Sequence, residues 1–160
     1  MHKQSLNNAS THYCGCFILP CNNAMWNCQQ SFEIWSSGDM PDTGFQNCVF
    51  ENNVCIDSGY CWGYDVRPNK AVSCHLLLYS IGCPLCDVTI KNNTFYRARI
   101  SPIYKSGGPD KLPEGYRLVG NTFFIEPGQD MAFRQSCSDE DYSSFFEKLA
   151  SENRIIATTF

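Results

Sequence analysis

The sequence predicts an all-β fold, a parallel β-helix of about four coils that ends in a short C-terminal helix. Three observations predict this solenoid. A turn containing Asn recurs along the chain, short strand-like runs precede and follow it, and no helical periodicity separates these runs. In such a fold each coil stacks on the previous one at about 4.8 Å, so equivalent side chains form ladders.

The recurring turn is marked by the last Asn of four similar segments: Asn8, Asn53, Asn93 and Asn121. The markers are separated by 45, 40 and 28 residues. Asn suits a tight turn between strands because its short amide tolerates left-handed backbone angles, and stacked copies can form an amide ladder. We expect the irregular spacing to be absorbed by loops that leave one corner of the coil.

Three strand-like runs are expected in each coil. The runs before the markers are 48–52, 87–92 and 116–120. The runs directly after them are 54–57, 94–100 and 122–126. The third runs are 32–37, 75–80, 101–106 and 130–135. Their spacing follows that of the Asn markers, which indicates one common register.

An antiparallel sandwich with Asn-containing turns is the alternative fold. It predicts hairpin loops of about two to five residues between paired strands. The connections between similar runs are longer than this, so the sequence favours the parallel solenoid.

The chain is expected to divide into coils over residues 1–137 and a C-terminal helix and tail over residues 138–160. Ser138 can cap a helix whose apolar face would hold Tyr142, Phe145, Phe146 and Leu149. This helix is expected to close the last coil, although it could also pack elsewhere on the surface. At the other end the first marker comes so early that the opening coil lacks a strand. We therefore expect the N-terminal coils of a longer solenoid to be missing, or another segment to cover this end.

Composition and charge restrict the partners. The net charge is −4 and the pI is near 5.3, with Lys and Arg scattered, so no basic surface is expected and nucleic acid is excluded as a partner. No apolar run is long enough to cross a membrane, and no membrane partner is expected. The start of the chain lacks the apolar core of a secretory signal. The localisation stays open, with secretion an option for a longer protein.

Eleven Cys allow three interpretations. CGC at 14–16 and CPLC at 83–86 have thiol spacings that can share a metal ion, but such a site needs a second matching pair. Disulfides are the second interpretation. Most of the other Cys fall singly where a repeat would place small buried residues, so buried hydrophobic thiols are the favoured interpretation.

The segment VTIKNNTFY, preceded by WGYDVRP and HLLLYS, resembles right-handed parallel β-helix repeat proteins of the pectate-lyase-like superfamily, particularly bacterial ones that act on polysaccharides. The resemblance covers roughly residues 5–135. It implies a right-handed coil and a carbohydrate-active protein, with a polysaccharide or oligosaccharide as partner. A polysaccharide hydrolase or lyase is the first expectation, and a non-catalytic glycan-binding or structural module is the alternative. The Asp cluster of a metal-dependent lyase is not recognisable, so neither metal nor cofactor is expected.

The candidate catalytic residues come from the insertion at 56–80, which stretches one coil, and from the coil before it. Asp65 or His75 could act as general acid or base, and Arg67 could neutralise a substrate carboxylate or a developing charge. Glu33 begins the third run of the preceding coil and could supply a second carboxylate for glycoside hydrolysis. The alternatives are structural: Arg67 paired with Asp65 to hold the loop, and His75 bonded to a loop carbonyl.

The candidate substrate-binding residues are Trp62 and Tyr64 in the insertion and Trp35 and Asp39 in the preceding coil. Tyr60 offers a further flat aromatic face in the insertion. Aromatic rings can pack against the C–H faces of sugars, while carboxylates bind their hydroxyls. The competing interpretation makes the rings loop-packing anchors and Asp39 a turn residue.

Overall fold

A computed structural model describes residues 20–36, 46–80, 86–105, 116–134 and 137–160. The strands are β1 (Ala24–Trp26), β2 (Phe32–Ser36), β3 (Gln46–Glu51), β4 (Val54–Ser58), β5 (Leu76–Ser80), β6 (Cys86–Lys91), β7 (Thr94–Ala98), β8 (Ile103–Lys105), β9 (Tyr116–Val119), β10 (Thr122–Ile125) and β11 (Arg154–Ala157). The helices are α1 (Gly63–Val66), a 3-10 turn at Lys70–Val72 and α2 (Asp139–Glu152).

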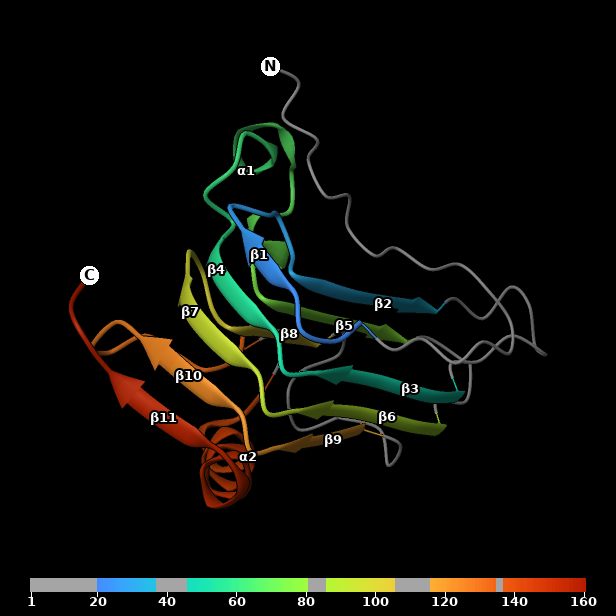
Figure 1. The fold of residues 1–160 in the computed structure, drawn as a ribbon. Coiled ribbons are helices and arrows are strands. Elements are labelled where there is room, and N and C mark those ends of the chain that lie inside the picture. Colours follow the sequence, from blue (N-terminus) through green and yellow to red (C-terminus); the bar gives the residue numbers. More distant parts are fainter. Residues whose placement is uncertain (1–19, 37–45, 81–85, 106–115, 135–136) are drawn as a thin grey trace.

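The described strands form three parallel sheets, which the chain visits in turn (Figure 1). One sheet has the order β1-β4-β7-β10-β11, the second β2-β5-β8 and the third β3-β6-β9. After β10, the chain makes a parallel bridge from Ala132 to Ile103 of the second sheet before it enters α2. This arrangement is compatible with a parallel β-helix, because the first three passages, β1 to β3, β4 to β6 and β7 to β9, each add one strand to each sheet.

The prediction of a mostly β chain with a C-terminal helix is confirmed, and every described strand pair is parallel. The antiparallel sandwich is therefore wrong. The ten predicted runs match strands except for 130–135, where the described residues 130–134 form only the bridge at Ala132. Two strands, β1 and β11, were not predicted, because each is short and lies beside an Asn that the spacing argument did not use.

An amide ladder runs along the residues that directly precede the five strands of the first sheet. Its five rungs are Asn23, Asn53, Asn93, Asn121 and Asn153. Along the ladder, each Oδ1 from the second rung onward accepts the backbone N–H and the Nδ2 of the preceding rung, at 2.9–3.1 Å. The four later rungs are buried. Their Nδ2 groups also bond main-chain carbonyls, so the buried amides are satisfied.

The position before each of the first four rungs explains why the motif often contains two Asn. Asn22, Asn52, Asn92 and Gly120 have φ values of 56°, 55°, 55° and 67°. This left-handed conformation favours Asn or Gly over other residues. The first residue of the pair therefore makes the turn, and the second makes the ladder.

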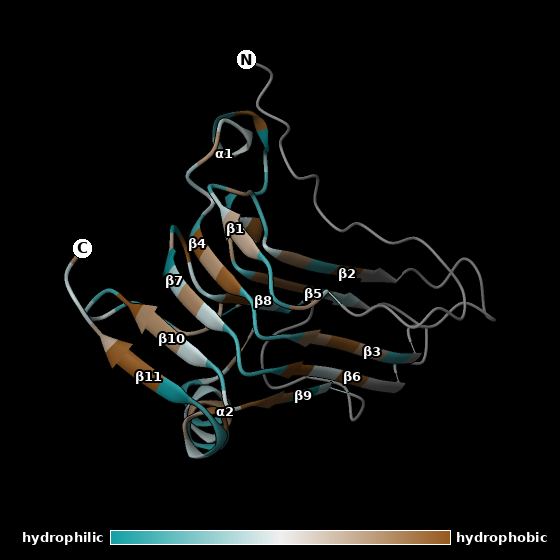
Figure 2. Cartoon of the chain, viewed as in Figure 1, coloured by the Kyte–Doolittle hydropathy of each residue, from teal (hydrophilic) through white to brown (hydrophobic). Residues whose placement is uncertain are grey.

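The core lies between the three sheets and contains an aromatic stack. The ring centroids of Phe32 and Phe50 are 4.5 Å apart, and those of Phe95 and Phe123 are 4.8 Å apart. Phe50 and Phe95 join the two pairs at 6.4 Å. Figure 2 shows hydrophobic colour concentrated in the strands, whereas the turns between them are mostly hydrophilic. Burial of these side chains supplies much of the stability of the fold.

Helix α2 begins as predicted and ends the Asn ladder. The Ser138 hydroxyl accepts the N–H of Asp141 at 3.1 Å, which caps the helix. The buried side chains of its apolar face are Tyr142, Phe145 and Leu149. Phe146, predicted to share that face, is 36% exposed. At the other helix end, Asn153 donates from Nδ2 to the carbonyl of Leu149, so α2 provides the last rung with an internal partner.

Among the described residues, the buried thiols favour the small-hydrophobe interpretation of the cysteines. Cys48, Cys55 and Cys74 are at most 2% exposed. Burial raises the pKa of Cys55 to about 12, so its thiol stays protonated at neutral pH. The CGC pair lies outside the described residues, and so does Cys83 of CPLC. No helix in the described ranges is long and apolar enough to cross a membrane.

Candidate functional site

The outer face of the five-stranded sheet carries a row of apolar side chains. The strand register aligns Trp26, Ile56, Tyr96, Phe124 and Ile156, one from each strand. We call these five residues the outer platform. Trp26 is 70% exposed and Tyr96 is 38% exposed. Because neighbouring strands lie about 4.8 Å apart, the row forms a continuous apolar surface across the strands.

A polar chain fixes the most exposed ring of the outer platform. The indole N–H of Trp26 donates to Oδ2 of Asp57 at 3.0 Å. The other carboxylate oxygen of Asp57 accepts from Nε of Arg97 at 2.7 Å. The bond from Arg97 holds the pKa of the Asp57 carboxyl below its usual range, so it stays ionised at neutral pH. These two hydrogen bonds hold the exposed Trp26 ring in one orientation, whereas an unbonded ring could rotate.

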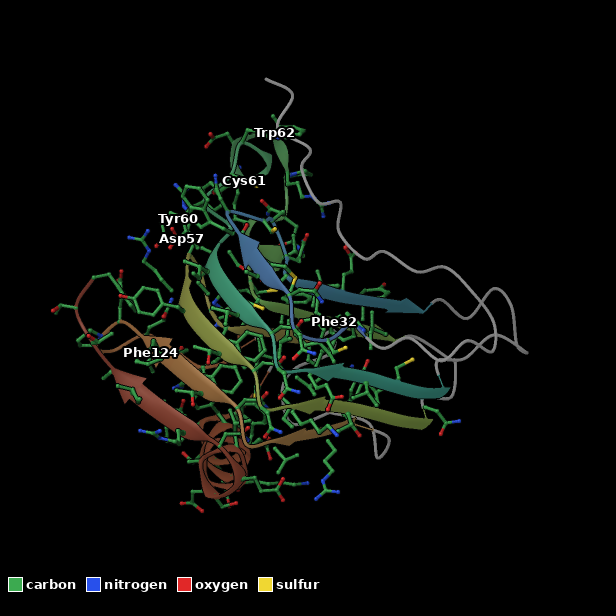
Figure 3. The ribbon with its side chains drawn as sticks, in the orientation of Figure 1. Phe32, Asp57, Tyr60, Cys61, Trp62 and Phe124 are labelled. Carbon is green, nitrogen blue, oxygen red and sulfur yellow. The ribbon has the colours of Figure 1, made fainter. Side chains whose placement is uncertain are left out.

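The backbone at the sheet corner directs these side chains. Asn27, Asp57 and Arg97 have φ values of 54°, 58° and 58°. Left-handed backbone is uncommon for Asp and rarer for Arg, and it is maintained only where the surrounding structure compensates for its cost. Asp57 lies at the end of β4 (Figure 3), and Arg97 lies near the end of the adjacent β7. The shared conformation brings their side chains together outside the sheet.

Beside the outer platform, a connected series of contacts alternates between cations and aromatic rings. Lys70 lies 4.7 Å from the centre of the Tyr64 ring, and Arg99 lies 3.4 Å from the same centre. Arg99 also lies 5.7 Å from the Tyr60 ring, and Arg97 lies 4.8 Å from that ring. We call these five residues the cation–aromatic column. Contacts between cations and ring faces stabilise both groups while leaving the edges of the guanidinium groups open.

The column forms because the insertion between β4 and β5 is fixed to the segment between β1 and β2. The N–H of Gly59 donates to the carbonyl of Cys28 at 2.7 Å, and Gln29 bonds the hydroxyl of Ser73 at 2.6 Å. Lys70 donates from Nζ to the main-chain carbonyls of Tyr64 and Asp65, where α1 would otherwise leave carbonyls unpaired. The insertion is therefore an ordered part of the site.

Gly59 is the residue at which crowding should matter most. Its φ is +84°, and an added Cβ would lie 2.7 Å from the Cβ of Ser73 and 3.0 Å from that of Arg99. We expect Gly59→Ala to lower the free energy of unfolding by about 2 kcal/mol, measured by urea denaturation. Gly128→Ala is the matched control, since Gly128 has a φ of +81° but open space around it, and should cost about 1 kcal/mol. Equal losses in the two variants would contradict the steric part of this prediction.

The structure places His75 inside the fold. Its ring is fully buried, Nδ1 lies 2.7 Å from the hydroxyl of Ser58, and the Phe95 ring is 5.3 Å away. Ser31 bonds the same Ser58 hydroxyl at 2.8 Å. Burial lowers the pKa of His75 to about 3, so the imidazole is neutral at physiological pH. In this position it has no direct access to a ligand on the surface.

The other predicted site residues are spread over several environments. Asp65 is exposed in α1, Arg67 is half-buried at its C-terminal end, and Glu33 is half-buried on β2. Trp62 is 79% exposed beside α1 (Figure 3). Of the predicted residues, only the two tyrosines of the insertion, Tyr60 and Tyr64, belong to the column.

Two predicted binding residues are not placed by the structure. Asp39 lies outside the described residues. Trp35 belongs to β2, but its side chain is not described.

Most of the observed site was not predicted, including Trp26, Tyr96, Asp57, Arg97 and Arg99. The sequence contains one signal for this site: Trp26 is the third residue after the pair Asn22–Asn23. The strand that follows such a pair alternates between outward and inward side chains, which places Trp26 on the outer face of β1.

No group of three or more His, Cys, Asp or Glu side chains that could hold a metal ion occurs within the described part of the chain. In comparisons with known proteins, no family model, curated protein or solved structure matches this chain.

Proposed function

We propose that this chain is a right-handed parallel β-helix of about four coils, of the pectate-lyase-like type, which binds a polysaccharide or oligosaccharide on the outer platform. The observation that carries the proposal is the exposed Trp26 ring, held by Asp57, which is in turn held by Arg97. The three parallel sheets and the Asn ladder support the fold, since both arise from coils that stack in register.

The chemistry of the platform suits a sugar. A pyranose ring has apolar C–H faces that pack on aromatic rings, and hydroxyl edges that bond charged groups. Trp26 and Tyr96 offer the aromatic surfaces. Asp57 offers a hydrogen-bond acceptor, and Arg97 offers hydrogen-bond donors. The residues project from paired strands, so binding would require little ordering of the protein.

Binding without cleavage is the form of the proposal that the geometry favours. Glycoside hydrolysis by the common mechanism uses two carboxyl groups, one of which must donate a proton. Asp57 is the carboxylate of the Trp26 chain, and its lowered pKa is unsuited to proton donation near neutral pH. His75 is buried away from the surface. A hydrolase or lyase that uses Asp65, Arg67 or Glu33 is the competing proposal.

The expected result of Trp26→Ala is a loss of glycan affinity of about tenfold or more, because the variant removes the largest exposed ring of the platform. The measurement is a glycan-array screen with the full chain, followed by calorimetric titration of the best ligand. Phe146→Ala, which removes an exposed ring from α2, is the matched control and should bind normally.

Two outcomes would count against this proposal. If Trp62→Ala abolished binding while Trp26→Ala did not, the ligand would sit on the insertion. Release of reducing ends or unsaturated products from a polysaccharide, lost in Asp65→Ala, would favour the enzyme.

A further inference from the structure

A pair of partly exposed thiols lies where the insertion between β4 and β5 meets the segment between β1 and β2. Cys28 belongs to that segment, and Cys61 lies near the start of the insertion (Figure 3). Both are free thiols in this structure, and both are partly accessible to solvent. Three strands, β2 to β4, separate them along the chain, but the fold brings their two segments together.

Hydrogen bonds on both sides of the pair hold these segments in contact. The N–H of Gly59, two positions before Cys61, donates to the carbonyl of Cys28 at 2.7 Å. The thiol of Cys61 donates to Oε1 of Gln29, the residue after Cys28, at 3.4 Å. Two residues span at most about 7 Å, so the backbone of Cys61 lies within short reach of Cys28. Disulfides join residues whose Cα atoms are about 4.4–6.8 Å apart, so the junction has the right size for one.

The two thiols also interact electrostatically. Partial burial raises the pKa of Cys28, and the negative charge of a Cys61 thiolate raises it further. Such repulsion acts between sulfur atoms of one cluster. A disulfide would remove the repulsion, because neither sulfur then carries a charge.

Cys55 is the competing partner among the described cysteines, because it also interacts electrostatically with Cys28. Its side chain is fully buried in the core, and burial raises its pKa to about 12. The thiolate is the nucleophile of disulfide exchange, so a protonated thiol that a dissolved oxidant does not reach is inert. Accessibility therefore favours Cys61 as the partner of Cys28.

We propose that Cys28 and Cys61 form a disulfide when the chain meets a low-molecular-weight disulfide such as oxidised glutathione. One cysteine thiolate attacks the oxidant, which forms a mixed disulfide and releases one glutathione thiolate. The second cysteine thiolate then attacks the sulfur of the first, which forms the protein disulfide and releases the second glutathione. The two glutathione molecules take up the two thiol protons, and two electrons pass from the protein to the oxidant.

The bond would fix the insertion, and with it the cation–aromatic column, to the segment between β1 and β2. The Cys28 carbonyl and the Gln29 side chain already anchor the insertion at this junction, so the cross-link strengthens an existing contact. It forms whether or not the outer platform binds a glycan.

The test incubates the full chain with oxidised glutathione at about pH 8, where thiolates are available. The remaining thiols are then alkylated, and the protein is digested with chymotrypsin for mass spectrometry. Cleavage after aromatic residues places Cys28 on peptide 27–32, Cys55 on peptide 51–60 and Cys61 on peptide 61–62. We expect peptide 27–32 linked to peptide 61–62, and we expect the link to disappear after reduction.

The cross-link should also stabilise the fold, because it restricts the unfolded chain. The oxidised protein is expected to unfold at a urea concentration about 1 M higher than the reduced protein. Cys61→Ser should lose both the linked peptides and this shift. Cys137→Ser is the matched control, since it removes a partly exposed thiol next to α2, and it should keep both.

Three results would overturn the proposal. The first is a peptide 27–32 that carries only glutathione or no modification after oxidation. The second is a link from peptide 27–32 to peptide 51–60, which would make Cys55 the partner. The third is an equal shift of the urea midpoint in Cys61→Ser, which would assign the stabilisation to another pair of cysteines.

Discussion

Asn93→Ala is expected to lower the free energy of unfolding by at least about 3 kcal/mol, because each buried polar group left unpaired costs about 1–3 kcal/mol. The Asn93 side chain accepts two bonds from Asn53 and donates to Oδ1 of Asn121 and to the carbonyl of Phe50, all at 2.9–3.0 Å. Alanine removes both its acceptor and its donors, so the backbone N–H of Asn53 loses its partner, and the side-chain amides of Asn53 and Asn121 each lose one bond. Urea denaturation measures the change.

Asn92→Gly is the matched control for this prediction. Asn92 is the adjacent residue of the same type, but it is exposed and contributes a left-handed turn instead of a rung. Glycine adopts the same backbone angles and occupies the equivalent position at Gly120 in the next coil. The control should therefore change stability by less than about 1 kcal/mol. A loss in Asn93→Ala no larger than in the control would mean that the ladder does not stabilise the fold.

The repeat could be predicted from sequence because one short motif performs two local tasks. An αL residue and a following Asn make a recognisable pair at 52–53 and 92–93, and Gly120 with Asn121 is a variant of it. The phase of the first coil was harder to predict. Asn8, the predicted marker, lies outside the described residues, and the rung before Asn53 is Asn23. The 45-residue gap between the markers therefore spanned a rung at Asn23, 30 residues before Asn53.

The candidate site depended on information that the local sequence does not contain. Trp26, Asp57 and Arg97 are 31 and 40 residues apart along the chain, and they meet because strand register aligns their corners. A one-residue change in register would move such side chains to the other face of the sheet. The aromatic insertion has an unusual composition, yet of the residues predicted there for the site only Tyr60 and Tyr64 belong to the cation–aromatic column. Composition alone therefore identified the insertion, whereas the pairing of strands determined which side chains form the outer platform.

His75 should make the fold sensitive to acid. Its pKa in the folded protein is lowered to about 3 by burial, whereas an unfolded His has a pKa near about 6.5. Between these values the unfolded chain binds a proton that the folded chain excludes, so stability falls as the pH falls. Asp57, a carboxylate that acts on the ring, favours the proton but does not outweigh burial. Above about pH 7, His75 is neutral in both the folded and the unfolded chain, so it no longer lowers the free energy of unfolding.

The free energy of unfolding is therefore expected to be lower by about 2 kcal/mol at pH 5 than at pH 7.5, and by about 3 kcal/mol at pH 4. His75→Asn is the informative comparison, because its amide can bond Ser58 but does not titrate. We expect this variant to be less stable at every pH, since it is smaller, but to lose the His75 part of the pH dependence. Urea denaturation of both proteins across this range measures the difference, in which carboxylates common to both cancel. Parallel pH profiles would show that His75 is protonated without cost, and so is not enclosed as the structure places it.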